Sequence, residues 1–167
     1  LRTIVFIYYS IAGYKKSYSA KGEDTIINLY FHDAGIKHGT YLDLGCFHPV
    51  SGSNTHLLHK SGWAGYCVDM DQFKLNAMKV FRRKNITTFL GAVSPNSIDG
   101  MKVPVYRFDT PWSDIDTIDK KSAIATSKKF NVTFQESEIS LLNINKLFED
   151  LPHINLLDID IEGLDVS

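Results

Sequence analysis

Cysteine is scarce in this chain of 167 residues, which has two, Cys46 and Cys67. Two cysteines cannot provide the several cross-links that hold small secreted folds together, so no disulfide framework is expected. The chain has no Cys-x-x-Cys pair and no Cys/His pair at metal-binding spacing, which argues against a structural zinc site. We expect both thiols to be reduced and the protein to be cytoplasmic.

An excess of charge of either sign is also missing. The chain has 18 Lys and Arg residues against 19 Asp and Glu residues, a formal net charge of −1. Nucleic-acid-binding proteins present a broad positive field to the phosphates. The charge balance therefore gives no reason to expect a nucleic-acid partner.

No apolar run is long enough to span a bilayer, and no membrane partner is expected. Residues 4–12 are mostly apolar and Gly13 follows them, which loosely resembles a signal peptide. Tyr8, Tyr9 and Ser10 interrupt this apolar character. A packed leading helix or strand is the favoured interpretation, and a targeting or anchor segment is the alternative.

The clearest pattern that is present is a strand, a loop and a helix between residues 41 and 60. Tyr41–Leu44 is typical of a short buried strand, and Gly45–Ser53 is a loop of small and polar residues. Glycine allows the backbone to approach a ligand closely. Asn54 is the expected N-cap of a helix over 55–60, whose free N–H groups would point back at the loop. This is the layout of a nucleotide-type cofactor site in an α/β sheet.

An acidic residue follows the second predicted strand, Tyr66–Val68. Asp69 ends this strand and lies 24 positions after Gly45. In dinucleotide-binding folds a carboxylate about 20 residues past the glycine loop accepts hydrogen bonds from the ribose hydroxyls. Asp69 is therefore predicted to hold a ribose, and Asp71 to cap the next helix.

That helix is predicted to face inward with Phe73, Ala77, Met78 and Phe81. Its last turn is followed by Arg82-Arg83-Lys84, which favours a solvated end that complements the helix dipole. A phosphate-binding role for these basic residues is the alternative.

The remaining elements are predicted from shorter patterns. Thr87–Val93 and Val103–Phe108 are typical of strands, and Asn143 is expected to cap a helix over 144–150. The polar stretch 109–140 is interpreted as an insertion or a hairpin.

The last predicted strand, residues 154–161, ends in Asp160-Ile161-Glu162-Gly163. Two carboxylates at the carboxyl end of a strand lie where open α/β sheets bind ligands. We therefore interpret residues 1–167 as one domain, with a leading helical segment at 1–35. A sheet of this type has more strands and another helix, so we expect the domain to be incomplete at its C-terminal end.

Three histidines raise the question of a metal. His48, His56 and His59 lie near the predicted loop and helix, but no carboxylate lies at a matching spacing. Loop packing and helix-surface roles are favoured, and no metal is expected.

Two phosphate-binding motifs, GxGxxG and GxxxxGK[ST], are missing from the chain. Their absence argues against NAD, FAD and nucleoside triphosphates. A cofactor with a ribose and no phosphate fits better, and S-adenosyl-L-methionine is the candidate.

Several stretches, spread in order over most of residues 17–163, carry a resemblance to a known family. They are Ser17-Tyr18-Ser19 with Gly22-Glu23-Asp24, Tyr41–Gly45 with His48-Pro49 and Ser53-Asn54-Thr55, Gly62-Trp63 with Gly65 and Val68-Asp69, Gly91–Ser94, and Ile159–Gly163. With these stretches the chain resembles the FkbM-type methyltransferases, which are S-adenosylmethionine-dependent. The resemblance implies an α/β fold of the Rossmann-like methyltransferase type, with three layers in the order α/β/α. It also implies O-methylation of a sugar or another small-molecule hydroxyl.

The resemblance implies roles at matching positions. The residues expected to bind the cofactor are Asp43, Gly45, Cys46, Ser53, Asn54, Asp69, Met70, Ala92, Val93 and Asp160. The acceptor hydroxyl must lose a proton, and the candidate bases are, in order of preference, Glu162, Asp160 and His48. Asp160 and Glu162 have an alternative role in binding the cofactor amine or capping the next helix.

The chain departs from the family pattern at Ala20, where related sequences often have glutamine, and it ends at Ser167. These departures keep open a non-catalytic binding module on the same Rossmann-like fold. A nicotinamide-dependent oxidoreductase on the same architecture is the other alternative.

Overall fold

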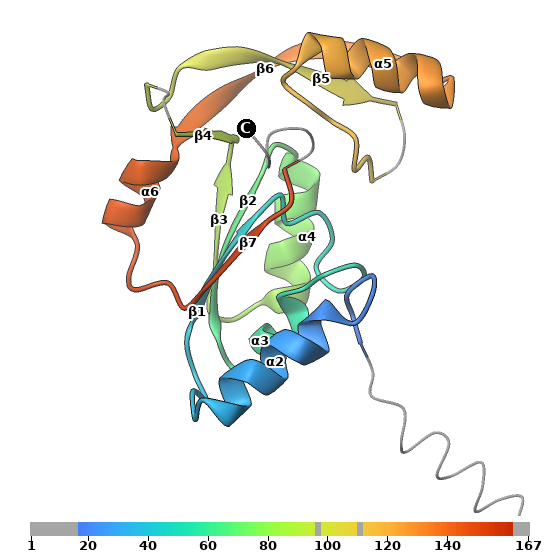
Figure 1. The fold of residues 1–167 in the computed structure, drawn as a ribbon. Helices are drawn as coiled ribbons and strands as arrows, with labels where there is room; N and C mark the ends of the chain where they lie inside the picture. Colours follow the sequence, from blue (N-terminus) through green and yellow to red (C-terminus); the bar gives the residue numbers. More distant parts are fainter. Residues whose placement is uncertain (1–16, 96–97, 110–111, 162–167) are drawn as a thin grey trace, which may run out of the picture.

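The computed structural model describes residues 17–95, 98–109 and 112–161, which form an α/β structure with two sheets (Figure 1). Its elements, in chain order, are α2 (Glu23–Asp33), β1 (Thr40–Leu44), α3 (His56–Lys60), β2 (Ala64–Asp69), α4 (Gln72–Arg82), β3 (Ile86–Leu90), β4 (Ala92–Ser94), β5 (Lys102–Phe108), α5 (Lys120–Phe130), β6 (Phe134–Asn143), α6 (Ile144–Asp150) and β7 (Leu156–Ile159). Within these described ranges, no helix is long and apolar enough to cross a membrane.

The larger sheet is parallel and has the strand order β3-β2-β1-β7. β1 lies inside it, and four of its five residues are buried. A parallel strand covered on both faces is expected to be apolar throughout. Asp43 is the exception in β1, which marks it for a role other than packing.

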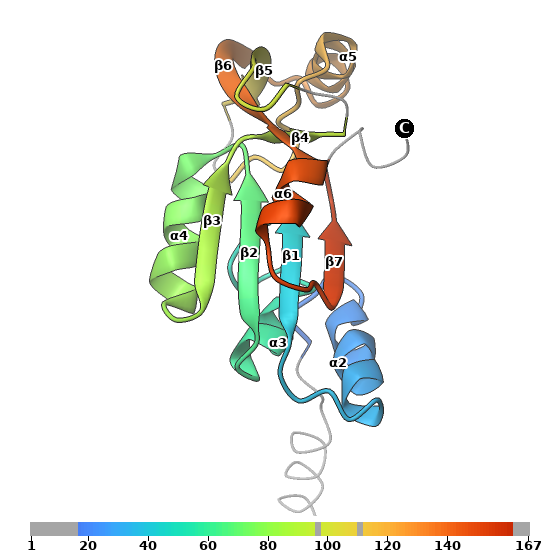
Figure 2. The ribbon, with the colours of Figure 1, turned by 90° about the vertical axis from the view of Figure 1, so that its left-hand side faces the viewer.

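Helices cover both faces of this sheet (Figure 2). On one face α2, α3 and α4 enclose a core that includes Tyr41 and Trp63. On the other face α6 packs its Leu147 against Leu42 and Leu44. Neighbouring residues of β1 therefore serve opposite cores, as the alternation along a strand requires. The layers and the strand order are compatible with a Rossmann-like fold.

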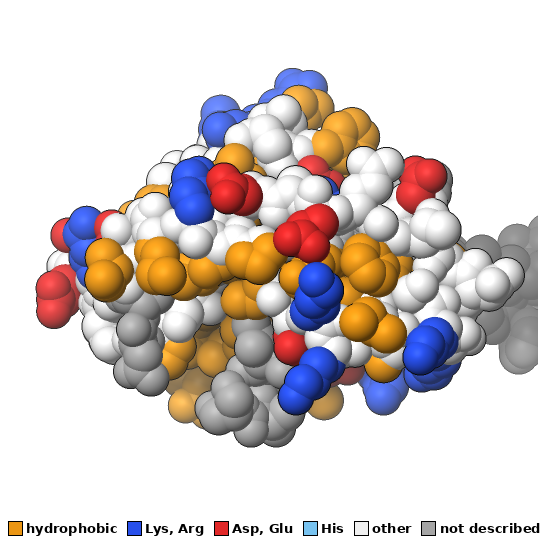
Figure 3. Space-filling model, turned by 90° about the horizontal axis from the view of Figure 1, so that it is seen from above, with side chains coloured by type: hydrophobic (Ala, Val, Ile, Leu, Met, Phe, Trp, Pro, Cys, Tyr) orange, Lys and Arg blue, Asp and Glu red, His pale blue; other side chains and the backbone are white. Residues whose placement is uncertain are grey.

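The smaller sheet has the order β4-β6-β5 and lies above the carboxyl ends of the parallel strands (Figures 1 and 2). β5 pairs antiparallel with β6, and β4 pairs parallel with it. Large hydrophobic side chains around this sheet are exposed, among them Met101 and Phe130. Seen from above, hydrophobic side chains form a band across the molecule (Figure 3).

The strand predicted at Thr87–Val93 is two strands in the structure. β3 ends at Leu90 and β4 begins at Ala92 in the other sheet. A Cβ atom on Gly91 would lie 2.8 Å from the backbone oxygen of Ser140 and 2.6 Å from Leu142 Cγ, both in β6. Glycine at this position lets β6 pack against the chain where it passes between the sheets.

The predicted inward face of α4 was wrong for two of its four residues. Phe73 and Phe81 are 62% and 65% exposed, whereas Leu75 and Met78 are buried. The caps predicted for α4 and α6 are correct: Asp71 accepts a hydrogen bond from the backbone N–H of Phe73, and Asn143 caps α6 in the same way.

The polar stretch 109–140 contains a helix that the sequence pattern did not indicate. α5 begins after Asp119, whose side chain accepts a hydrogen bond from the backbone N–H of Ser122. Ala123 is its one fully buried residue and packs against Tyr106 and Phe108 of β5. Its two large apolar residues, Ile124 and Phe130, are exposed, so the sequence does not indicate which side of the helix is buried.

Candidate functional site

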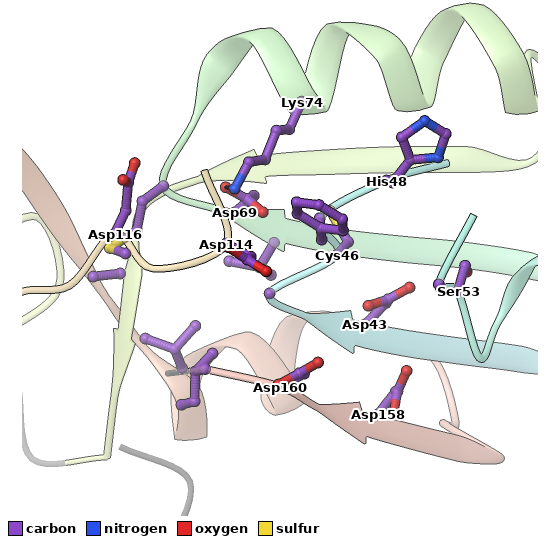
Figure 4. A pocket seen from close by; sticks show the side chains of 18 of the residues that line it. Asp43, Cys46, His48, Ser53, Asp69, Lys74, Asp114, Asp116, Asp158 and Asp160 are labelled. Carbon is purple, nitrogen blue, oxygen red and sulfur yellow. Dashed lines mark ion pairs between the residues drawn. The ribbon is translucent and has the colours of Figure 1, made fainter. Parts of the chain in front are cut away.

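A cavity opens at the carboxyl ends of the parallel strands, between them and the segment 114–118 (Figure 4). It encloses about 190 Å³, whereas one water needs about 10–15 Å³ on the same measure. In the parallel sheet, β2 lies on one side of β1 and β7 lies on the other. The direction in which the chain adds strands therefore reverses between β1 and β7. Such a switch point is where open α/β sheets bind ligands.

The structure brings all but one of the predicted site residues to this cavity. Those that line it are Asp43, Gly45, Cys46, His48, Ser53, Asn54, Asp69, Met70, Ala92, Val93 and Asp160. Glu162, the preferred base, lies outside the described residues.

Gly45 begins the loop after β1 and has a φ of +83°. Its backbone N–H donates to the carbonyl of Val68 at 2.9 Å, which ties the loop to β2. A Cβ atom here would overlap the carbonyl oxygen of Asp160 at the end of β7. Glycine is therefore needed both for the backbone conformation and for the close approach of two strand ends.

The helix after this loop begins one residue later than predicted, because Thr55, not Asn54, precedes α3. Ser53 Oγ accepts hydrogen bonds from the backbone N–H groups of Thr55 and His56. Asn54 instead donates its side-chain amide to Asp158 Oδ1 at 3.1 Å. Asn54 thus links the loop to β7, and Ser53 takes the capping role.

Asp43 lies at the floor of the cavity and is 5% exposed. Its Oδ2 accepts a hydrogen bond from Thr55 Oγ1 at 2.5 Å and lies 3.8 Å from Arg82 Nη1. Burial raises the pKa of Asp43 to about 6, although the Arg82 guanidinium lowers it in part. This carboxylate changes its charge close to neutral pH.

Asp69 ends β2 and is 8% exposed. Its Oδ1 accepts a hydrogen bond from the backbone N–H of Asp71 at 2.8 Å and lies 3.9 Å from Lys74 Nζ. Burial raises the pKa of Asp69, and the Lys74 ammonium opposes this shift. Asp71 caps α4 and does not line the cavity, so the structure separates the two acidic residues after β2.

Apolar side chains line the cavity beyond Asp69. Met70, Ala92, Val93 and Ile118 contribute to this part, and the carbonyl of Met70 is fixed by Arg107 Nη2, which donates to it at 2.6 Å. A flat heteroaromatic ring suits such a surface.

The end of β7 adds two carboxylates, Asp158 and Asp160. Burial raises the pKa of Asp158, and the hydrogen bond from Asn54 opposes the shift. The backbone N–H of Asp160 donates to the carbonyl of Leu44 at 2.9 Å, while its side chain stays exposed. Asp160 is thus the described carboxylate of β7 that a ligand can reach most easily.

The hydrogen bonds of His48 favour a role as a hydrogen-bond donor over a role as a general base. Its Nδ1 accepts hydrogen bonds from the backbone N–H groups of Val50 and Ser51, at 3.1 and 2.9 Å. A ring nitrogen that accepts two N–H groups carries no proton, so the proton of the neutral ring is on Nε2, and burial, which lowers the pKa of His48, favours this neutral form. A neutral ring with Nδ1 already used as an acceptor can offer Nε2–H to a ligand.

The other two predicted loop or helix histidines have local partners. The ring of His56 packs edge-on against Tyr18, and His59 Nε2 lies 2.7 Å from the carbonyl oxygen of Arg82. Among the described residues, no group of three His, Cys, Asp or Glu side chains is arranged to hold a metal ion.

Arg82 was predicted to lie in solvent, and this was wrong. It is 2% exposed, and its guanidinium lies beneath the loop after β1. The adjacent Arg83 is exposed, as predicted, and its Nε donates to the carbonyl of Val80 in the last turn of the helix. Two neighbouring basic residues of the same type therefore have opposite environments.

Sequence reasoning missed several residues that line the cavity, among them Lys74, Asp114, Asp116 and Asp158. Asp158 could have been found, because it is two residues before Asp160 in a strand and thus on the same face. Asp114 and Asp116 come from the polar stretch after β5, and no local pattern distinguishes them there.

The cavity is strongly acidic. Its described lining has six aspartates (Asp43, Asp69, Asp114, Asp116, Asp158 and Asp160) and one basic side chain, Lys74, which lies next to Asp69. Two arginines behind the lining, Arg82 and Arg107, pair with Asp43 and Asp116, so aspartates still outnumber the basic side chains. Such a lining repels phosphate and attracts cations. Comparisons of this chain with protein-family models, with curated proteins and with solved structures found no match.

Proposed function

We propose that this protein is an S-adenosylmethionine-dependent methyltransferase that methylates a hydroxyl group of a sugar or another small molecule. The acidic cavity at the switch point of the parallel sheet carries the proposal. It has a buried carboxylate at the end of β2 and a glycine loop after β1, and its described lining residues include no group of basic side chains that could bind a pyrophosphate.

Three parts of the cavity lining suit the three parts of this cofactor. Asp69 offers two carboxylate oxygens to a ribose diol, and the apolar surface of Met70, Ala92 and Val93 suits an adenine. The carboxylates of Asp43 and Asp158 suit an ammonium and a sulfonium, which are both cations. NAD and FAD carry pyrophosphates, so the same lining disfavours them.

When bound, S-adenosylmethionine supplies an electrophilic methyl group to the acceptor oxygen. The protein must align the acceptor and remove its hydroxyl proton. Asp160 is exposed at the end of β7 on the edge of the cavity, and we assign it the role of proton acceptor among the described residues. His48 is assigned a donor role through Nε2–H, which would orient the acceptor or the cofactor.

Titration calorimetry with S-adenosylmethionine and, separately, with NAD tests the cofactor assignment. We expect binding of S-adenosylmethionine and none of NAD. Binding of NAD alone would favour an oxidoreductase, and binding of neither would refute the methyltransferase assignment. Binding of S-adenosylmethionine without transfer to any of a panel of sugar hydroxyls would instead indicate a non-catalytic binding module.

The affinity for S-adenosylmethionine is expected to fall on acidification. Burial raises the pKa of Asp43 to about 6 and raises those of Asp69 and Asp158 as well. A cation is bound by the ionised carboxylates, so each protonation weakens binding. One group with a pKa of about 6 gives a roughly tenfold loss of affinity at pH 5 relative to pH 8. Calorimetry over this range checks the slope, and Asp43→Asn should flatten it; an affinity independent of pH would contradict the electrostatic argument.

A further inference from the structure

Arg82 is the last residue of α4 and is buried, although a basic residue at a helix end usually lies in solvent. Its guanidinium is surrounded by acceptors. Nε donates to the carbonyl of Pro49 at 3.1 Å, and Nη2 donates to Ser53 Oγ at 2.7 Å. Nη1 donates to Thr55 Oγ1 at 3.0 Å and to the hydroxyl of Tyr41 at 2.9 Å.

Three of these four acceptors belong to the segment 49–55, which closes the cavity on the side of β1. Pro49 accepts with its backbone and Ser53 and Thr55 with their hydroxyls, so both ends of the segment are held by one planar group. Arginine presents several N–H donors in a rigid fork, whereas lysine is a point charge on a flexible stem. The arrangement thus requires the shape of arginine as well as its charge.

The same hydrogen bonds extend to groups that face a ligand. Ser53 lines the cavity and also caps the first turn of α3. Thr55 donates to the Asp43 carboxylate, which lies 3.8 Å from Arg82 Nη1. Arg82 is thus connected through hydrogen bonds both to the loop and to the carboxylate at the cavity floor.

We propose that Arg82 is a positioning residue, whose guanidinium holds the segment 49–55 and the Asp43 carboxylate in the geometry that the cavity's ligand requires. The identity of that ligand as S-adenosylmethionine rests on the function proposed above. The mechanical part of the inference, that Arg82 orders this segment, does not depend on it.

The test compares Arg82→Lys with Arg83→Lys. The Arg83 side chain is exposed, and its described hydrogen bond goes to the carbonyl of Val80, outside the loop. Hydrogen–deuterium exchange of the ligand-free proteins is followed over residues 46–55 and, as an internal reference, over β6 in the smaller sheet. We expect Arg82→Lys to speed exchange in 46–55 at least tenfold while β6 stays as in the parent protein. Arg83→Lys should leave both unchanged. Equal exchange of 46–55 in the parent protein and Arg82→Lys would overturn the proposal.

The binding arm uses calorimetry with S-adenosylmethionine. Arg82→Lys is expected to bind about tenfold more weakly, and Arg83→Lys as tightly as the parent. Leu147→Ala, in α6 on the opposite face of the sheet, provides a variant of lowered melting temperature that leaves the loop intact. An equal loss of affinity in Leu147→Ala would show a general effect of stability and would overturn the positioning role.

The exchange experiment and the calorimetry test the positioning role and the proposed function separately. If the parent protein binds no S-adenosylmethionine, the proposed function fails, and the exchange arm still decides whether Arg82 orders the loop. Should Arg82→Lys not fold, Tyr41→Phe removes an acceptor of the guanidinium that lies outside the segment 46–55, and it leaves the segment's own hydrogen bonds in place. Faster exchange over 46–55 in Tyr41→Phe supports the proposal, and exchange equal to that of the parent overturns it.

Discussion

Gly45→Ala is expected to lower the free energy of unfolding by about 2–5 kcal/mol. The backbone at this position has a φ of +83°, where an L-residue costs about 1–2 kcal/mol. The added methyl group would also overlap the carbonyl oxygen of Asp160. Because the obstacle is backbone and not the end of a flexible side chain, the ends of β1 and β7 must move apart, which costs about another 1–3 kcal/mol. Chemical denaturation followed by circular dichroism measures the loss.

Gly52→Ala is the matched control for this effect. Gly52 belongs to the same loop and has a φ of +71°, but a Cβ atom there meets nothing within 4 Å. Only the backbone cost of about 1–2 kcal/mol is expected for it. The difference between the two variants isolates the close approach of the strand ends, and equal losses would show that this approach does not matter for stability.

The parts of the fold that local sequence patterns determine were predicted well. β1 and β2 are short apolar segments that each end in a polar loop, and both lie where they were expected. The predicted caps Asp71 and Asn143 act on the N–H groups of the turn that follows them. Such features depend on neighbours in sequence, so the sequence alone suffices to place them.

The features that the sequence did not predict depend on contacts between distant segments. Nothing in Arg82-Arg83-Lys84 shows which basic side chain is buried, because the acceptors of Arg82 come from residues 41–55. The exposed positions of Phe73 and Phe81 follow in the same way from the orientation that α4 adopts on the sheet. An apolar residue on a helix indicates an inward face only when it is known which side of the helix packs on the sheet.

The break at Gly91 has a similar origin. The run Thr87–Val93 is continuous in β propensity, but the chain changes sheets within it because β6 packs against Gly91. This change carries the chain from the parallel sheet to the smaller sheet above the strand ends. The smaller sheet in turn brings the segment 114–118 over the cavity, where Asp114 and Asp116 add to its negative charge. A distant element thus completes the electrostatic character of a site whose floor was predicted from local patterns.

The acidic character of the whole cavity bears on how any single carboxylate should be tested. Asp43 and Asp158 interact with each other and with other charged groups, so a change at either alters several pKa values at once. Asp69 has Lys74 close by and lies at the end of β2, at the other side of the cavity floor from β7. A substitution there gives a clearer measure of one contact.

Asp69→Ala is expected to weaken binding of S-adenosylmethionine by about 1–3 kcal/mol, or about 5- to 150-fold. The carboxylate is buried and would accept hydrogen bonds from two ribose hydroxyls, and alanine leaves both hydroxyls without a partner. The variant also removes the ion-pair partner of the buried Lys74 ammonium, which keeps its hydrogen bond to the carbonyl of Ser113, so we expect a protein that is less stable but folded. Calorimetry at pH 8 measures the affinity.

Asp71→Asn is the matched control, two residues further along the chain. Asp71 caps α4 through the backbone N–H of Phe73, and asparagine caps a helix about as well as aspartate. The control should therefore keep both the stability and the affinity of the parent protein. If Asp69→Ala binds as tightly as Asp71→Asn, then Asp69 does not hold the ribose, and the cofactor must lie elsewhere in the cavity or be a different molecule.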